Sequence, residues 1–131
     1  REHVVPLPAQ TVQMLHRLHA ISGDRIHLFP GRDDRNKPMS VHSIRQALKV
    51  LGWSGTYSPH GTRTTGSTRL NEMGYRPDAI EAQLAHAEPN SVRRTYNHAT
   101  YLEERRNMMQ AWADKLEIWK RESTGEVSRT Q

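Results

Sequence analysis

Apolar residues recur every three or four positions along most of the chain, which is the period of an α-helix with one buried face. The pattern predicts helices over residues 9–21 and 40–51, each followed closely by a glycine that favours a helix end. Ser58 and Pro59 predict the start of a third helix, because serine caps helices well and proline suits the first helical position. The expected fold is mainly α.

The helical period continues towards the C-terminus. Pro77 opens one short helical segment, and a second short segment follows Pro89 as far as Tyr96. From Tyr101 to Arg121 a single apolar stripe predicts a long helix. The stripe consists of Leu102, Met108, Met109, Trp112, Leu116 and Trp119. Residues 122–131 are polar, and we expect them to form a flexible tail.

Two segments depart from the helical period. Residues 1–7 are rich in β-branched side chains and are followed by proline, which predicts a short N-terminal β-strand. Residues 23–40 are rich in Gly, Pro, Asp and Asn, which predicts a loop. Ile26, Leu28 and Phe29 are the apolar residues of this loop, and we expect them to pin it to the core.

Composition narrows the possible chemistry. A chain of 131 residues corresponds to one domain. The absence of cysteine excludes disulfides, a thiol nucleophile and a thiolate zinc site. No apolar stretch approaches the about 20 residues that cross a bilayer, and the first residues lack a signal-peptide pattern, so we expect a cytosolic protein. His16, His19, His42 and His98 lack matching ligands and are interpreted as solvated surface rather than metal ligands.

Charge points to a polyanionic partner. The chain has 19 Lys and Arg against 14 Asp and Glu, a formal net charge of +5. The excess is concentrated early, because residues 1–59 hold eight basic and four acidic residues, whereas residues 99–131 hold six of each. Nucleic acid is the first partner to consider, with a merely solvated basic surface as the alternative.

His60 and Arg63 stand three positions apart at the helix start predicted by Ser58 and Pro59. Residues three apart share one face of a helix, so two hydrogen-bond donors point the same way. Helix N-termini favour anions through free amides and the macrodipole, which makes this pair a plausible phosphate site. The same short motif also fits a solvated helix start.

A second histidine, His86, follows 23 positions after Arg63, and Tyr96 follows 10 positions later. The order His, Arg, His, Tyr at these spacings resembles the tyrosine recombinases, or phage-integrase family of site-specific DNA recombinases. The likeness is strongest to prophage integrases of genomic islands, which typically insert at tRNA genes. It runs from residue 3 to about Trp119 through further shared motifs, which are His3–Leu7, Leu28–Pro30, Leu84–His86, Tyr96–His98 and Tyr101–Arg106.

The resemblance implies a role for each site residue. His60 would transfer a proton, His86 would donate to a phosphate oxygen, and Tyr96 would attack phosphorus to form a 3′-phosphotyrosyl link. The chemistry agrees, because a tyrosine hydroxyl with a pKa of about 10 needs a base and nearby cations to attack a phosphodiester. Arg63 can supply a bidentate guanidinium to the nonbridging oxygens. No metal or other cofactor is implied.

The resemblance identifies residues 1–121 as the C-terminal portion of a recombinase catalytic domain. The family's catalytic set also includes an arginine and a lysine that precede the segment matching residues 3–7, and no residue of this chain is assigned to either. We therefore expect little or no recombination by these 131 residues alone. The implied partners are double-stranded attachment-site DNA and other copies of the enzyme, as a tetramer on DNA at the bacterial nucleoid.

Several interpretations stay open at this stage. Spacing favours Tyr96 as the nucleophile, with Tyr101 as the alternative. Backbone phosphates could be contacted by Arg32, Arg35, Lys37, Arg45, Lys49, Arg93 and Arg94. A non-catalytic DNA-binding remnant or accessory module is the other function to weigh. A type IB topoisomerase shares the tyrosine chemistry, but the integrase-like flanking motifs argue against it.

Overall fold

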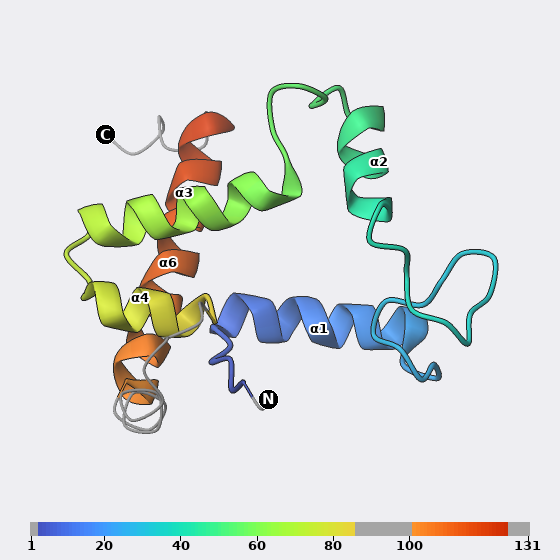
Figure 1. Ribbon diagram of the computed structural model, residues 1–131, viewed down its shortest axis with the longest axis horizontal. Coiled ribbons are helices and arrows are strands. Elements are labelled where there is room, and N and C mark those ends of the chain that lie inside the picture. The colour runs from blue at the N-terminus through green and yellow to red at the C-terminus, as the bar shows by residue number, and fades with distance from the viewer. Residues whose placement is uncertain (1–2, 86–100, 126–131) are drawn as a thin grey trace. The chain divides into compact units, whose positions relative to one another are not determined.

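The computed structural model describes residues 3–85 and 101–125, and its regular structure is helical (Figure 1). The helices are α1 (Ala9–Ser22), α2 (Ser43–Val50), α3 (Pro59–Glu72), α4 (Pro77–Gln83) and α6 (Leu102–Ser123). The mainly α fold expected from the sequence is confirmed. The predicted short segment after Pro89 lies outside the described residues, and α6 extends through the first two residues of the predicted tail.

Local chemistry explains where α3 and α2 begin. Pro59 takes the first position of α3, and the Ser58 hydroxyl accepts a hydrogen bond from the Gly61 amide at 3.1 Å, so both predicted start signals are used. α2 begins at Ser43 rather than at Ser40. The Ser40 hydroxyl instead accepts a hydrogen bond from the His42 amide at 3.3 Å and so caps the turn that precedes the helix.

The predicted N-terminal strand is wrong for the residues that the structure describes, because residues 3–7 have no regular secondary structure. A strand requires a neighbouring strand, and here the Val4 carbonyl accepts a hydrogen bond from the Arg105 side chain at 2.6 Å instead. The segment is nevertheless anchored, because Pro6 and Pro8 are buried. An apolar sequence can thus be fixed to a core without pairing in a sheet.

The loop over residues 23–42 is also not pinned to the core as predicted. Ile26, Leu28 and Phe29 have exposed fractions of 83%, 53% and 52%. Main-chain bonds close the loop on itself, from the Gly31 amide to the Lys37 carbonyl at 2.7 Å and from the Met39 amide to the Phe29 carbonyl at 2.8 Å. Its shape therefore depends on its own hydrogen bonds.

The chain divides into two compact units. Unit 1 comprises residues 1–11 and 66–131, and unit 2 comprises residues 12–65, so the division falls inside α1 and α3. Unit 1 contains a hydrophobic core in which Leu70, Ile80 and Met108 are buried. These three residues come from α3, α4 and α6, and Tyr75, Leu84 and Trp112 pack around them.

Unit 2 has a different character. None of its residues is buried. Its most exposed large apolar side chains are Met14, Ile21, Ile26, Val41, Val50 and Leu51. Its described side chains are at most partly buried, and the unit thus has no fully buried apolar core. In the part of the chain that the structure describes, no helix is both long and apolar enough to cross a membrane.

Truncating the core should destabilise unit 1 far more than truncating the surface of the same helix. Met108 is fully buried, whereas Ile118 is 46% exposed, and both lie on α6. We expect Met108→Ala to lower the free energy of unfolding by about 2–5 kcal/mol, because it leaves a cavity. Ile118→Ala is the matched control and should cost clearly less in urea denaturation followed by circular dichroism. Equal costs would contradict the assigned core.

The cap on α3 gives a second prediction. Ser58→Ala removes the acceptor for the Gly61 amide and should lower the free energy of unfolding by about 1 kcal/mol. Ser54→Ala is the control, because Ser54 lies in the same connecting segment and makes no hydrogen bond within the described residues. If the two variants had the same Tm, the Ser58 cap would not contribute to stability and the prediction would be wrong.

Candidate functional site

The first turns of α3 place two of the predicted site residues. His60 and Arg63 follow Pro59 at the start of the helix, three positions apart, so their side chains leave the same face. Both side chains are exposed. The first turn of α3 contains no acidic residue, so nothing there competes for the positive end of the helix dipole.

A pocket of about 440 Å³ lies within unit 2, beside the start of α3. α2 contributes Arg45 and Lys49 to its lining, and the segment that leads into α3 contributes Tyr57, Ser58 and Pro59. Within the described residues no carboxylate lies at ion-pair distance from either cation. The pocket therefore combines two positive charges with hydroxyl groups, and this combination suits an anionic ligand.

The net charge of the protein belongs to unit 2. That unit contains eight Lys and Arg but three Asp, whereas unit 1 contains eleven basic and eleven acidic residues. No acidic residue occurs between Asp34 and Glu72, a stretch that includes α2 and most of α3. His60 and Arg63, two of the side chains predicted to meet a phosphate, thus lie in a segment with no negative charge of its own.

The other two predicted site residues, His86 and Tyr96, lie outside the described residues, as do Arg93 and Arg94. The structure therefore brings His60 together with Arg63 and does not test the remaining pair. It does describe the chain just before His86. There Ala85 follows the end of α4 with a φ of 54°, in the left-handed region that L side chains rarely adopt.

The structure describes the contacts of Tyr101, the alternative nucleophile. Its side chain is 9% exposed, and its hydroxyl accepts a hydrogen bond from the Arg76 Nη2 at 3.3 Å. The Arg76 guanidinium also lies 5.0 Å from the centre of the Tyr101 ring. Of the other tyrosines, Tyr75 packs against the core and Tyr57 lines the pocket. Tyr101, at the start of α6, is thus held by packing and by the guanidinium of Arg76.

Sequence reasoning missed a buried cation in unit 1. Arg105 is 1% exposed and donates from Nε to the Gln83 Oε1 at 2.9 Å and from Nη2 to the Val4 carbonyl at 2.6 Å. Burial lowers the pKa of the Arg105 guanidinium from its ordinary value. The signal was present in the sequence, because Arg105 falls at helical spacing between Tyr101 and Met108 and so lies on the apolar face of α6.

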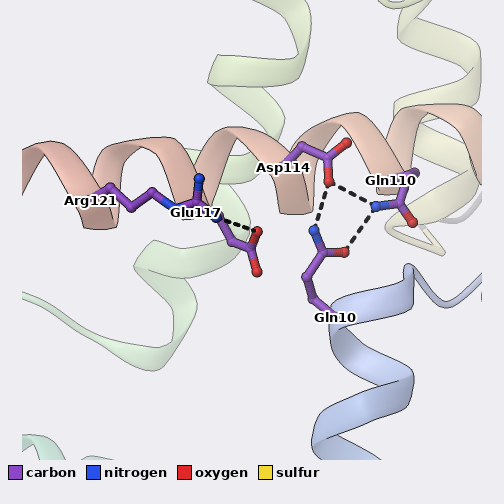
Figure 2. A network of polar contacts seen from close by, with 5 residues as sticks. All are labelled: Gln10, Gln110, Asp114, Glu117 and Arg121. Carbon is purple, nitrogen blue, oxygen red and sulfur yellow. Dashed lines mark hydrogen bonds and ion pairs between the residues drawn. The ribbon is translucent and has the colours of Figure 1, made fainter. Parts of the chain in front are cut away.

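α6 also holds the start of α1 through a polar network (Figure 2). The Gln110 Oε1 accepts from the Ala9 amide at 2.9 Å and so satisfies a free amide at the first residue of α1. Gln10 donates to the Asp114 Oδ1 at 2.7 Å, and Gln110 donates to the Gln10 Oε1 and to the Asp114 Oδ1, both at 2.9 Å. Apart from the contact between Gln110 and Asp114 within α6, these contacts join residues about a hundred positions apart in the chain.

The described residues were also considered as ligands for a metal ion. Among residues 3–85 and 101–125, no group of three or more His, Asp or Glu side chains could hold a metal ion. The exposed His16, His19 and His42 agree with their interpretation as surface residues.

Comparison with known proteins agrees with the motifs. The model of the phage integrase family matches residues 1–103. The chain is 47% identical over 114 residues to Prophage integrase IntA of Escherichia coli K12, covering 87% of this chain and 28% of that protein. It is 45% identical over 116 residues to the integrase of Shigella phage Sf6, covering 88% of this chain and 30% of that protein.

The chain thus spans less than a third of the length of these relatives. No solved structure matches it significantly. The family model nevertheless covers well over half of the chain, from residue 1 to residue 103. The chain belongs to the phage integrase family.

Proposed function

We propose that the chain is the C-terminal portion, over residues 1–121, of the catalytic domain of a site-specific DNA recombinase. The enzyme would integrate and excise prophage DNA by breaking and rejoining strands through a 3′-phosphotyrosyl intermediate. The relatives are named as prophage and phage integrases, which supports this class of reaction. Such a reaction takes place on the bacterial chromosome, and so in the cytoplasm at the nucleoid.

In this proposal Tyr96 attacks the scissile phosphorus and the 5′ oxygen leaves. Arg63 binds the nonbridging oxygens through its planar guanidinium, and His86 donates to one of them. His60 transfers a proton. The energy of the broken phosphodiester is kept in the phosphotyrosyl bond, so a 5′ hydroxyl of another strand can reverse the attack. The observation that carries the proposal is the placement of His60 and Arg63 on one exposed face at the start of α3.

Arg45 and Lys49 are proposed to contact the DNA backbone. They line the pocket next to the residues that open α3, without an acidic partner among the described residues. Backbone contacts position a protein on the duplex while base contacts specify sequence. On DNA the enzyme would act as a tetramer, as the family resemblance implies.

Covalent capture of DNA tests the nucleophile. The test protein is a hybrid integrase in which this chain replaces the matching 114-residue segment of Prophage integrase IntA. On a nicked duplex that carries the attachment site of that relative, the hybrid should form a covalent complex resistant to denaturing electrophoresis. Tyr96→Phe should abolish the complex, because it removes the attacking oxygen.

Tyr101→Phe is the matched control for capture. It removes the hydroxyl that accepts from Arg76 but keeps the ring, so capture should persist. The reverse pattern would reassign the nucleophile. A folded, DNA-binding hybrid that forms no covalent complex would favour the non-catalytic DNA-binding module. The 131-residue chain alone should not join DNA, since it offers no residue for the other arginine and the lysine of the family's set.

Salt dependence tests the proposed backbone contacts. Arg45→Gln and Lys49→Gln should each weaken binding of the chain to duplex DNA. The loss should be similar for duplexes of unrelated sequence. Each should also reduce the slope of log K against log salt by about 0.9 for every phosphate that the variant no longer neutralises. Lys120→Gln, an exposed lysine of α6 in the neutral unit 1, is the control and should leave the slope unchanged. Unchanged slopes for the α2 variants would refute these contacts.

A further inference from the structure

The segment between α2 and α3 is folded back onto the end of α2. The Trp53 amide donates to the Leu48 carbonyl at 2.9 Å, and the Tyr57 amide donates to the Trp53 carbonyl at 3.0 Å. Gly52 and Gly55 have φ values of 82° and 81°, a left-handed conformation that glycine adopts without steric cost. A short series of main-chain hydrogen bonds therefore sets where Tyr57 lies relative to α2.

The Tyr57 side chain belongs both to the pocket of unit 2 and to the start of α3. It lines the pocket together with Arg45 and Lys49. Its ring lies over the first turn of α3, because a Cβ built at Gly61 would lie 3.6 Å from the Tyr57 Cε2. The side chain is 39% exposed, and its hydroxyl makes no hydrogen bond to any residue that the structure describes. The pocket therefore has an uncharged donor that is available to a ligand.

The two cations of the pocket stand next to each other on α2. Arg45 and Lys49 are four positions apart, a spacing that puts side chains on the same face of a helix. With the Tyr57 hydroxyl they give one pocket three donor groups, two of them charged. The pocket volume of about 440 Å³ lies in the range of ligand-binding clefts. Residues 35–71 contain no acidic side chain, which favours an anion over a neutral ligand.

We propose that this pocket binds a single backbone phosphate of duplex DNA, held by the Arg45 guanidinium, the Lys49 ammonium and the Tyr57 hydroxyl. The inference rests on the proposed function, which supplies DNA as the partner. It goes further by assigning both cations to one phosphate and by adding Tyr57 as an uncharged ligand. Because the Tyr57 ring lies over the first turn of α3, this phosphate is anchored beside the helix start that holds His60 and Arg63.

The first experiment measures binding of the 131-residue chain to a fluorescent duplex over a range of salt concentrations. Tyr57→Phe keeps the ring on α3 and removes only the hydroxyl. It should weaken binding by about 10-fold, the scale of one hydrogen bond to a charged group. The slope of log K against log salt should stay unchanged, because the variant loses no charge. Tyr75→Phe, at the tyrosine that packs against the core of unit 1, is the matched control and should bind like the unsubstituted chain.

A double-mutant cycle tests whether the donors share one phosphate. Arg45→Gln loosens that phosphate in the pocket, so Tyr57→Phe should then weaken binding by about 3-fold or less instead of about 10-fold. Donors that contact separate phosphates would give losses that multiply. Circular dichroism and the Tm establish that each variant is folded. If Arg45→Gln is not folded, Lys49→Gln takes its place in the cycle.

Four results would overturn the assignment. They are a chain that does not bind duplex DNA, unchanged binding by Tyr57→Phe, a salt slope that Tyr57→Phe reduces, and losses that multiply in the cycle. A reduced slope would mean that Tyr57 acts only by holding the cations in place. Failure of the proposed function looks different, because the hybrid integrase would then form no covalent complex or Tyr96→Phe would retain it.

Discussion

The hydrogen bonds of the buried Arg105 guanidinium constrain the rest of unit 1. A cation removed from water must find acceptors for its N–H groups, and here they come from residues about a hundred and about twenty positions earlier in the chain. These two hydrogen bonds tie the N-terminal segment and the end of α4 to α6. The small core of Leu70, Ile80 and Met108 then forms where α3, α4 and α6 meet, and Gln110 adds the start of α1.

Stability and charge are divided between the two units. Unit 1 has the buried residues and no net charge, whereas unit 2 has the entire net charge of +5 and no buried residue. Residues 35–71 contain no acidic side chain, so the exposed cations of α2 and α3 give this stretch a positive potential. α3 contributes to both units, since its first turns hold His60 and Arg63 and its last turns supply Leu70 to the core. The cap at Ser58 thus begins the helix that carries both the predicted site residues and part of the core.

The helices were predictable because their signals are local. Apolar spacing, Ser58 with Pro59, and Gly52 after α2 act within one or two turns, and the structure uses them. The N-terminal strand was mispredicted because β-propensity does not supply a pairing partner, and the Val4 carbonyl bonds to a side chain from the other end of the chain. The loop residues Ile26, Leu28 and Phe29 were expected in the core because they are apolar. The sequence does not reveal that main-chain hydrogen bonds close the loop on itself while these side chains stay exposed.

The candidate site, like the fold, was predictable from the sequence only in part. The candidate residues were identified from their spacing in the sequence. His60 and Arg63 share a face of α3 because three positions make nearly one helical turn. Arg45 and Lys49 were already candidate phosphate contacts from the sequence, but the pocket that they line became apparent only in the structure. The buried Arg105 was likewise recognised only from contacts between residues far apart in the chain. The structure also describes Tyr101, whose hydroxyl and ring both contact Arg76, whereas Tyr96 lies outside the described residues and its role as the nucleophile stays a prediction from spacing.

The central claim is that Tyr96 forms the bond to DNA, and the most direct test locates that bond. The tryptic peptide from Thr95 to Arg105 contains both Tyr96 and Tyr101, so fragmentation of this peptide from the nuclease-treated covalent complex can distinguish them. We predict that the nucleotide phosphate is attached to Tyr96 and that Tyr101 is unmodified. Attachment to Tyr101, or to a residue outside this peptide, would contradict the claim.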